Sequence, residues 1–179
     1  MQITLLADSD ETFWVDVLNA LARHNERQYR ADSSLPPLYR SGVRYLRNEQ
    51  DLWCMARPDA CSERVGELWC DIVKIYELGF EDCDGLAAAR AGELLARGAS
   101  ALTQRDGPAF YVARARRARE IQAQVFLRTR QPEGERGGLY HCLVRYRLRL
   151  GRNWSRWFTD DPSARLGMGS DAPDALLST

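Results

Sequence analysis

Cys83 is the residue of this chain that is best placed for chemistry, because it lies between two aspartates at the start of an alanine-rich run, Glu-Asp-Cys-Asp-Gly-Leu-Ala-Ala-Ala-Arg. We expect this run to begin a helix, whose N-terminus carries a partial positive charge and backbone N–H groups without helical partners. Both features stabilise a thiolate, the form of cysteine that attacks carbonyl groups. The flanking Asp82 and Asp84 act in the opposite direction, because a nearby negative charge disfavours the thiolate. A cationic histidine is therefore needed to activate Cys83.

Only two histidines are available for that role. His24 continues the pattern of an amphipathic N-terminal helix, and we expect it at the edge of that helix. His141 lies in an apolar run, Leu-Tyr-His-Cys-Leu-Val-Arg-Tyr, that predicts a strand. Further along the chain, Asp160 and Asp161 precede Pro162. A nucleophile, a base and a carboxylate able to orient the base thus follow one another in the sequence.

This order and these local sequences resemble the transglutaminase-like branch of the papain-like thiol enzymes. In that superfamily the cysteine starts a helix, the histidine lies on the following sheet, and an aspartate before a proline orients the histidine. The match is closer to small phage- and prophage-encoded members, which carry blocks like Gly-Asp-Cys-Glu-Asp-Leu-Ala-Ala, Tyr/Trp-His and Glu-Asp-Pro-Ser-x-x-Leu-Gly-Met. The blocks here read Glu-Asp-Cys-Asp-Gly-Leu-Ala-Ala, Tyr-His and Asp-Asp-Pro-Ser-Ala-Arg-Leu-Gly-Met, within residues 38–169. Two positions depart from the pattern: Glu81 stands where glycine is usual, and Gly85 where a second acidic residue is usual.

The resemblance implies an acyl-transfer enzyme of phage or prophage origin. Cys83 would be the nucleophile, His141 the base, and Asp161 the carboxylate that holds the imidazole. Asp161 is favoured over Asp160 because the family aspartate directly precedes the proline. A protein or peptide amide would be the substrate, with no cofactor and no metal. Peptidase, isopeptidase, deamidase and crosslinking activities stay open, because one triad serves all of them.

Two further points remain open at this stage. The backbone N–H of Cys83 is the natural first donor to an oxyanion, and the superfamily takes a second from an upstream side chain. Trp69 and Trp53 both offer an indole N–H for this purpose. The competing hypothesis is a catalytically silent, virion-associated structural or assembly protein that keeps the fold and binds other phage structural proteins through its N-terminal helix.

The residues also have simpler interpretations. Cysteines are among the most buried residues, so Cys83 alone would be a core residue. The acidic group Glu81, Asp82 and Asp84 could bind a cation or imitate the Asp-x-Asp of sugar-nucleotide transferases, but helical side chains two positions apart do not converge. An arginine run could contact phosphates, although alternation along a strand more often gives one solvated face; it comprises Arg114, Arg116, Arg117 and Arg119.

The composition limits the possible classes of function. The chain has 179 residues, enough for one domain with a core, and Lys+Arg and Asp+Glu both total 25. This balance argues against nucleic acid or a membrane surface as a partner. No apolar run approaches the ~18 residues of a membrane-spanning helix, and the first residues lack a signal-peptide pattern. We therefore expect a soluble protein of the host cytoplasm, or one carried into a virion.

The five cysteines do not have the spacing of metal ligands. In a reducing cytosol we expect free thiols, with a Cys54–Cys61 bridge as the alternative.

The periodicity predicts helices first and then an antiparallel sheet, which is an α+β fold. We expect a strand at 2–6, a helix from residue 8 to about 30, and helices at 62–78 and 83–97 that end at Gly79 and Gly98. Strands are expected at 121–127, 139–150 and 154–159. A loop at 32–37 predicts a division into an N-terminal extension (1–37), a catalytic core (38–169) and a tail (170–179).

Overall fold

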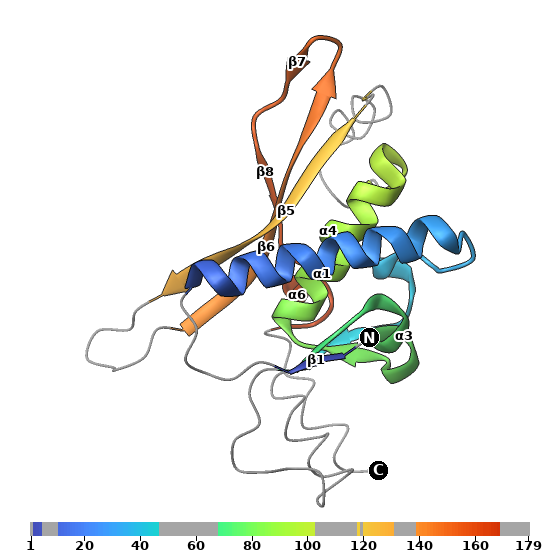
Figure 1. Ribbon diagram of the computed structural model, residues 1–179, viewed down its shortest axis with the longest axis vertical. Coiled ribbons are helices and arrows are strands. Elements are labelled where there is room, and N and C mark those ends of the chain that lie inside the picture. Colours follow the sequence, from blue (N-terminus) through green and yellow to red (C-terminus); the bar gives the residue numbers. More distant parts are fainter. Residues whose placement is uncertain are drawn as a thin grey trace, which may run out of the picture.

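The computed structural model describes residues 2–4, 11–46, 68–102, 118, 120–130 and 139–168. In this part of the chain, helices α1 (Glu11–Ala31) and α4 (Cys83–Arg97) pack beside an antiparallel sheet (Figure 1). The sheet consists of β5 (Ile121–Arg130), β6 (Leu139–Leu150), β7 (Asn153–Trp154) and β8 (Phe158–Asp160). The α+β arrangement with helices first and an antiparallel sheet after them is as predicted.

Small residues let α1 and α4 approach each other closely. A Cβ atom added at Gly92 would lie 2.6 Å from Cβ of Asn25 and 2.8 Å from the carbonyl oxygen of Ala22. Only glycine fits at this crossing without displacing α1. Apolar residues of both helices and of the sheet form one buried cluster, which includes Leu18, Leu21, Ala87, Ala91, Val125 and Val144. Helix α1, which belongs to the expected N-terminal extension, therefore supplies part of that core.

Asn19 of α1 closes the outer edge of the sheet. Its side-chain oxygen accepts from the backbone N–H of Val125 at 2.9 Å, and its amide group donates to the Val125 carbonyl at 3.2 Å. These two bonds replace the ones that a neighbouring strand would make with β5. On the other side, the central strand β6 pairs with β5 along its length and with β8 at Val144–Tyr146.

The segment before α4 differs from the prediction of one helix over residues 62–78. From Leu68 onward the structure has a strand, β3 (Leu68–Cys70), and then a short helix, α3 (Ile72–Leu78). The helix begins where it does because the Asp71 side chain accepts from the backbone N–H of Lys74 at 3.0 Å. Trp69 and Cys70, on opposite faces of β3, are both fully buried. A strand buried on both faces has the same continuous apolar pattern as a buried helix, so periodicity could not separate the two.

Short pairings lead the chain into α4. Strand β3 pairs with β1 (Gln2–Thr4), and β4 (Phe80–Glu81) pairs in parallel with β2 (Arg44–Tyr45). Gly79 ends α3 with a φ of 79°, and α4 runs from Cys83 to a cap at Gly98, as predicted. The remaining short helices are η1 (Leu38–Arg40), η3 (Gly98–Ala101) and α6 (Pro162–Arg165).

A buried group of charged side chains ties the middle of α4 to the end of the sheet. Arg90, which is 1% exposed, donates from Nε to Asp160 at 2.8 Å and from Nη1 to Glu93 at 2.8 Å. Arg165 of α6 pairs with the same Asp160 carboxylate at 3.1 Å. Strand β8 and helix α6 are thereby fixed against α4.

Several predictions concern residues outside the described ranges. These are the side chains of Trp53, Cys54 and Cys61, the arginine run at 114–119 and the tail at 170–179.

Candidate thiol site

Cys83 is the first residue of α4, and the N-cap Asp82 fixes that start because its side chain accepts from the backbone N–H of Asp84 at 3.0 Å. The side chain of Cys83 is half-buried against the main core cluster. The N–H groups of the first helical turn, including that of Cys83, have no partner within the helix. The local sequence thus places the thiol where the sequence analysis expected it, at a helix N-terminus.

His141 and Asp161 approach each other from the sheet and from the turn that follows it. His141 lies near the start of β6, and Asp161 follows β8 directly and caps α6 through a 3.0 Å bond from the Ala164 N–H to Oδ1. The other carboxylate oxygen, Oδ2, lies 2.9 Å from Nε2 of His141. The side chains of His141 and Asp161 are 24% and 32% exposed, so solvent and ligands can reach the pair. One carboxylate therefore caps a helix and orients an imidazole at the same time.

His141 also interacts with Cys83, and this interaction with the thiol is the main cause that raises the pKa of His141 to about 9. Burial opposes it, and the hydrogen bond and charge of Asp161 raise the pKa further. The three residues that the sequence placed in order along the chain are therefore connected in space, cysteine to histidine to aspartate.

The pKa of Cys83 is lowered from its ordinary value. The largest cause is a hydrogen bond with the thiol of Cys142, followed by the opposing effect of burial and by the hydrogen bond with His141. Asp84 opposes ionisation, since the Cys83 Sγ donates to its Oδ1 at 3.0 Å and its charge repels a thiolate. The pKa of Cys142 is strongly raised, because of its contact with Cys83 and its burial, so Cys142 keeps its proton and acts as the donor.

Cys142 was not singled out in the sequence. It directly follows His141, and alternation along a strand would send the two side chains to opposite faces. The signal that could have found Cys142 is its position next to His141. If His141 faces the start of a helix, the next residue on the strand also lies near that helix start.

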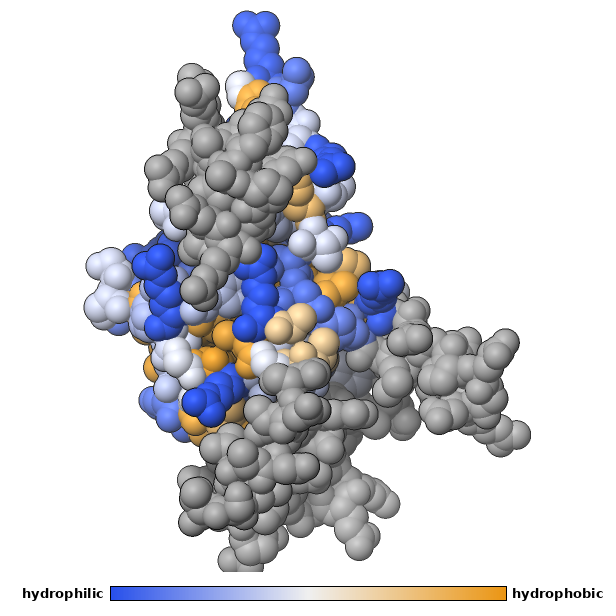
Figure 2. Space-filling model, turned by 180° about the vertical axis from the view of Figure 1, so that it is seen from behind, coloured by the Kyte–Doolittle hydropathy of each residue, from blue (hydrophilic) through white to orange (hydrophobic). Residues whose placement is uncertain are grey.

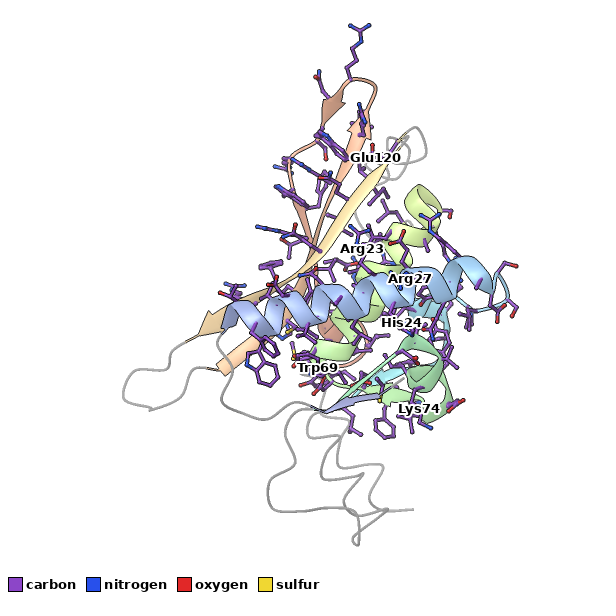
Figure 3. All side chains as sticks on the ribbon, in the orientation of Figure 1. Arg23, His24, Arg27, Trp69, Lys74 and Glu120 are labelled. Atoms are coloured by element: carbon purple, nitrogen blue, oxygen red, sulfur yellow. The ribbon has the colours of Figure 1, made fainter. Side chains whose placement is uncertain are left out.

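Trp69 lies beside the first turn of α4 (Figure 3). The ring is fully buried, contacts Trp14 edge-on, and donates its indole N–H to Asp84 Oδ2 at 3.2 Å. In this arrangement the N–H is directed to Asp84 and not to a carbonyl oxygen at the thiol. Trp69 therefore orients Asp84, whose other oxygen receives the Cys83 thiol.

The acidic residues around Cys83 do not converge on one point. Asp82 caps α4, Asp84 contacts the thiol, and Glu81 is fully buried beneath the helix. A Cβ atom added at Gly85 would lie 2.4 Å from Cγ and Cδ of Glu81, so the Glu81 side chain fills the space that a side chain at position 85 would need.

One group in the described part of the chain has atoms of the kinds that bind a transition metal. The Sγ atoms of Cys83 and Cys142 and a carboxylate oxygen of Asp84 lie within 4.8 Å of one another. Thiolates and carboxylates are ligands of Zn²⁺, so added zinc would compete directly for the thiol.

The other candidate residues have structural roles. Asp160 belongs to the buried ion pairs with Arg90 and Arg165, which leaves Asp161 as the carboxylate at the imidazole. His24 lies 3.3 Å from Asp71, the cap of α3. A cavity of about 640 Å³ lies between α1 and β5, lined by residues such as Asn19, Arg23 and Gln122, and none of the three triad residues lines it.

No family model, no curated protein and no solved structure matches this chain. Within the described residues, no helix is both long enough and apolar enough to cross a membrane.

Proposed function

We propose that this chain is a thiol enzyme that transfers acyl groups from protein or peptide amides. The observation that carries the proposal is the grouping of Cys83, His141 and Asp161 from α4, β6 and the turn before α6: His141 bonds to Asp161 at 2.9 Å, and it interacts with Cys83. The site is also reachable, because His141 and Asp161 are partly exposed. A purely structural histidine would have no need of a thiol as well as a carboxylate beside its ring.

The reaction follows from these contacts. The imidazole takes the proton of Cys83, and Asp161 stabilises the resulting imidazolium and holds its orientation. The thiolate attacks the amide carbonyl, the carbon–nitrogen bond breaks, and ammonia or an amine leaves with the proton from His141. Water or an amine then attacks the thioester, giving hydrolysis, deamidation or a crosslink. The backbone N–H of Cys83 at the start of α4 has no partner within the helix and would donate to the oxyanion, and no cofactor is required.

We further propose that the chain belongs to the transglutaminase-like branch, near its small phage-encoded members. The order of cysteine helix, histidine strand and aspartate turn supports this. The two departures from the family pattern support it as well, because they compensate each other. Glu81 stands in place of a glycine, and its side chain fills the space that an acidic side chain at position 85 would need. One carboxylate has therefore changed its position along the chain, and the volume is conserved.

Alkylation kinetics test the proposal without knowledge of the substrate. Iodoacetamide should label Cys83 faster than Cys70 or Cys142 near neutral pH, as followed by mass spectrometry of peptides, because the thiolate is the reactive form and the other two thiols are buried. His141→Ala should slow labelling of Cys83, whereas His24→Ala, the matched control, should leave it unchanged. Labelling should persist in EDTA. Equal labelling of all three thiols, or no effect of His141→Ala, would contradict an activated nucleophile.

Substrate turnover is the second part of the test. Casein with a dansylated primary amine reports crosslinking, and ammonia release reports deamidation. Cys83→Ala should abolish either signal while circular dichroism shows an unchanged fold; Cys70→Ala controls for loss of a thiol. If Cys83→Ala supports production of infectious particles by the parent genome as well as the unmutated chain does, the structural or assembly role is correct and the enzyme is not.

A further inference from the structure

The sheet extends beyond the helices, and its projecting end carries a row of cationic and aromatic side chains (Figures 1 and 3). Along β6 the even-numbered residues Cys142, Val144, Tyr146 and Leu148 are buried, and the odd-numbered ones lie on the opposite face, which is exposed at Arg145 and Arg149 but buried at Leu143. Among these odd-numbered residues are Arg145, Arg147 and Arg149. In the space-filling view the projecting end is mainly hydrophilic, with a few apolar residues among the polar ones (Figure 2).

Tryptophans separate these arginines and form an alternating stack with them. The guanidinium groups of Arg145 and Arg147 lie 5.2 and 4.7 Å from the ring centre of Trp157. Those of Arg147 and Arg149 lie 4.8 and 5.9 Å from the ring centre of Trp154. Stacking on aromatic rings holds guanidinium groups in place and keeps their N–H edges available. We call these five residues the arginine–tryptophan face.

The charges of this face are largely retained. Nε of Arg147 donates to the side-chain oxygen of Gln122 at 2.7 Å, a neutral partner that positions the guanidinium without cancelling its charge. Among the described residues, Arg149 is the one member of the face that pairs with a carboxylate, and this exposed bond to Glu120 is 2.9 Å long. A chain with a formal net charge of zero thus concentrates positive charge on one projecting surface.

The face shares strand β6 with the thiol site, and the buried Leu143 lies between them on the same side of the strand. His141 lies on the same strand, and its neighbour on β5 is the exposed Arg128. At about 3.3 Å per residue, Arg145 lies roughly 13 Å from His141 along the strand, and Arg149 lies roughly 26 Å away. An extended segment laid along β6 would therefore reach the thiol with one part and the arginines with another.

We propose that the arginine–tryptophan face binds an extended acidic segment of the substrate protein, and this inference rests on the proposed function. An extended peptide repeats its side chains on one side at the same interval as β6, so acidic residues at alternate positions meet Arg145, Arg147 and Arg149 in turn. Carboxylates fit the paired N–H groups of a guanidinium. Single-stranded nucleic acid needs open ring faces for its bases, whereas Trp154 and Trp157 are each flanked by two guanidinium groups.

Fluorescence anisotropy tests this proposal on the Cys83→Ala chain, which binds without reacting. The probe is a fluorescein-labelled peptide in which glutamate alternates with threonine. We expect binding that weakens with salt, and an increase in Kd of about tenfold or more for Arg145→Gln with Arg147→Gln. The matched control is Arg23→Gln with Arg27→Gln, which removes two exposed charges from α1 (Figure 3) and should leave Kd unchanged. A peptide of the same composition with its glutamates in one block should bind more weakly.

Three results would overturn the proposal. Equal losses in the two double variants would show a response to net charge alone. Tighter binding of oligothymidylate, lost in the Arg145→Gln, Arg147→Gln chain, would identify a nucleic-acid surface. No measurable binding of the glutamate peptide would exclude the ligand. Iodoacetamide labelling of the unmutated chain tests the thiol separately, so an inert thiol with intact peptide binding would refute the enzyme and leave the face standing.

Discussion

Two adjacent carboxylates, Asp160 and Asp161, have opposite environments. Asp160 is 3% exposed and bonds to Arg90 and Arg165, whereas Asp161 is 32% exposed on its side chain and bonds to His141. Alternation at the end of β8 sends the first inward to α4 and the second outward to the histidine. The inner carboxylate fixes the position of the turn, and the outer one is free to act on the imidazole. The ion pairs of Asp160, which we call the anchor, thus keep the adjacent Asp161 in position beside His141.

The largest expected effect separates the two carboxylates by stability. Asp160→Ala leaves the buried guanidinium of Arg90 without one of its two carboxylate partners, removes the partner of the partly exposed Arg165, and should lower the free energy of unfolding by about 3–5 kcal/mol. Asp161→Ala removes only the cap of α6 and an exposed pair, so a loss of about 1 kcal/mol is expected. Urea unfolding followed by circular dichroism measures both. Similar losses for the two variants would mean that the anchor and the site are not separate.

The second expectation concerns pH and uses Asp161→Asn, since asparagine also caps helices. The pKa of His141 is raised from 6.5 to about 9, so protonation of His141 stabilises the fold fully below pH 6.5, and this contribution is lost as the pH rises through about 9. Without the Asp161 charge the pKa should fall, and the loss should begin at lower pH. NMR titration of the two histidine rings measures the shift, with His24→Gln for assignment. An unchanged pKa would show that Asp161 does not act on the imidazole.

The features of the fold and of the site that could be predicted from the sequence depend on local signals. The start of α4 at Cys83, its end at Gly98 and the β5–β6 pairing all follow from capping residues, glycine and strand alternation. Local signals also placed Cys83, His141 and Asp161 on a helix start, a strand and a turn. What they could not supply was the packing between distant segments: the strand at Leu68–Cys70 depends on its partner β1, and the anchor of Asp160 depends on Arg90, far away in the chain.

Contacts at the thiol itself were hidden for the same reason. The influence of Asp84 on Cys83 could be expected because the two residues are adjacent, whereas the interaction of the Cys142 thiol with Cys83 joins distant segments and has no signature in residue spacing. The hydrogen bond from the Trp69 indole to Asp84 likewise forms only because β3 lies beside α4. A sequence therefore identifies candidate chemical groups more readily than the neighbours that tune them.

A third expectation probes the first turn of α4, between the thiol and the anchor. Gly85→Ala should cost about 1–3 kcal/mol, because the new Cβ would overlap the buried Glu81 side chain. In a Glu81→Gly background the same change should cost much less, and Gly85→Asp should be tolerated there. The coupling energy of this double-mutant cycle, from urea unfolding, measures the exchange of positions directly. Additive effects would show that Glu81 and Gly85 do not compensate each other, and this support for the transglutaminase-like resemblance would be lost.

The smallest expected effect is at Cys142, the buried neighbour of the thiol. Cys142→Ala removes the hydrogen bond that contributes most to the lowered pKa of Cys83, while the remaining bond to His141 is kept. A neutral hydrogen bond of this kind contributes about 0.5–1.5 kcal/mol, so alkylation of Cys83 at neutral pH should slow by roughly two- to tenfold. Above the pKa of an ordinary thiol, where Cys83 is ionised in both chains, the rates should converge. Cys142→Ser retains a donor and should restore most of the rate, which a mere packing defect at position 142 would not allow. A slower rate at all pH values in both variants would instead mean that Cys142 only holds β6 against α4, and that His141 alone sets the ionisation of the thiol.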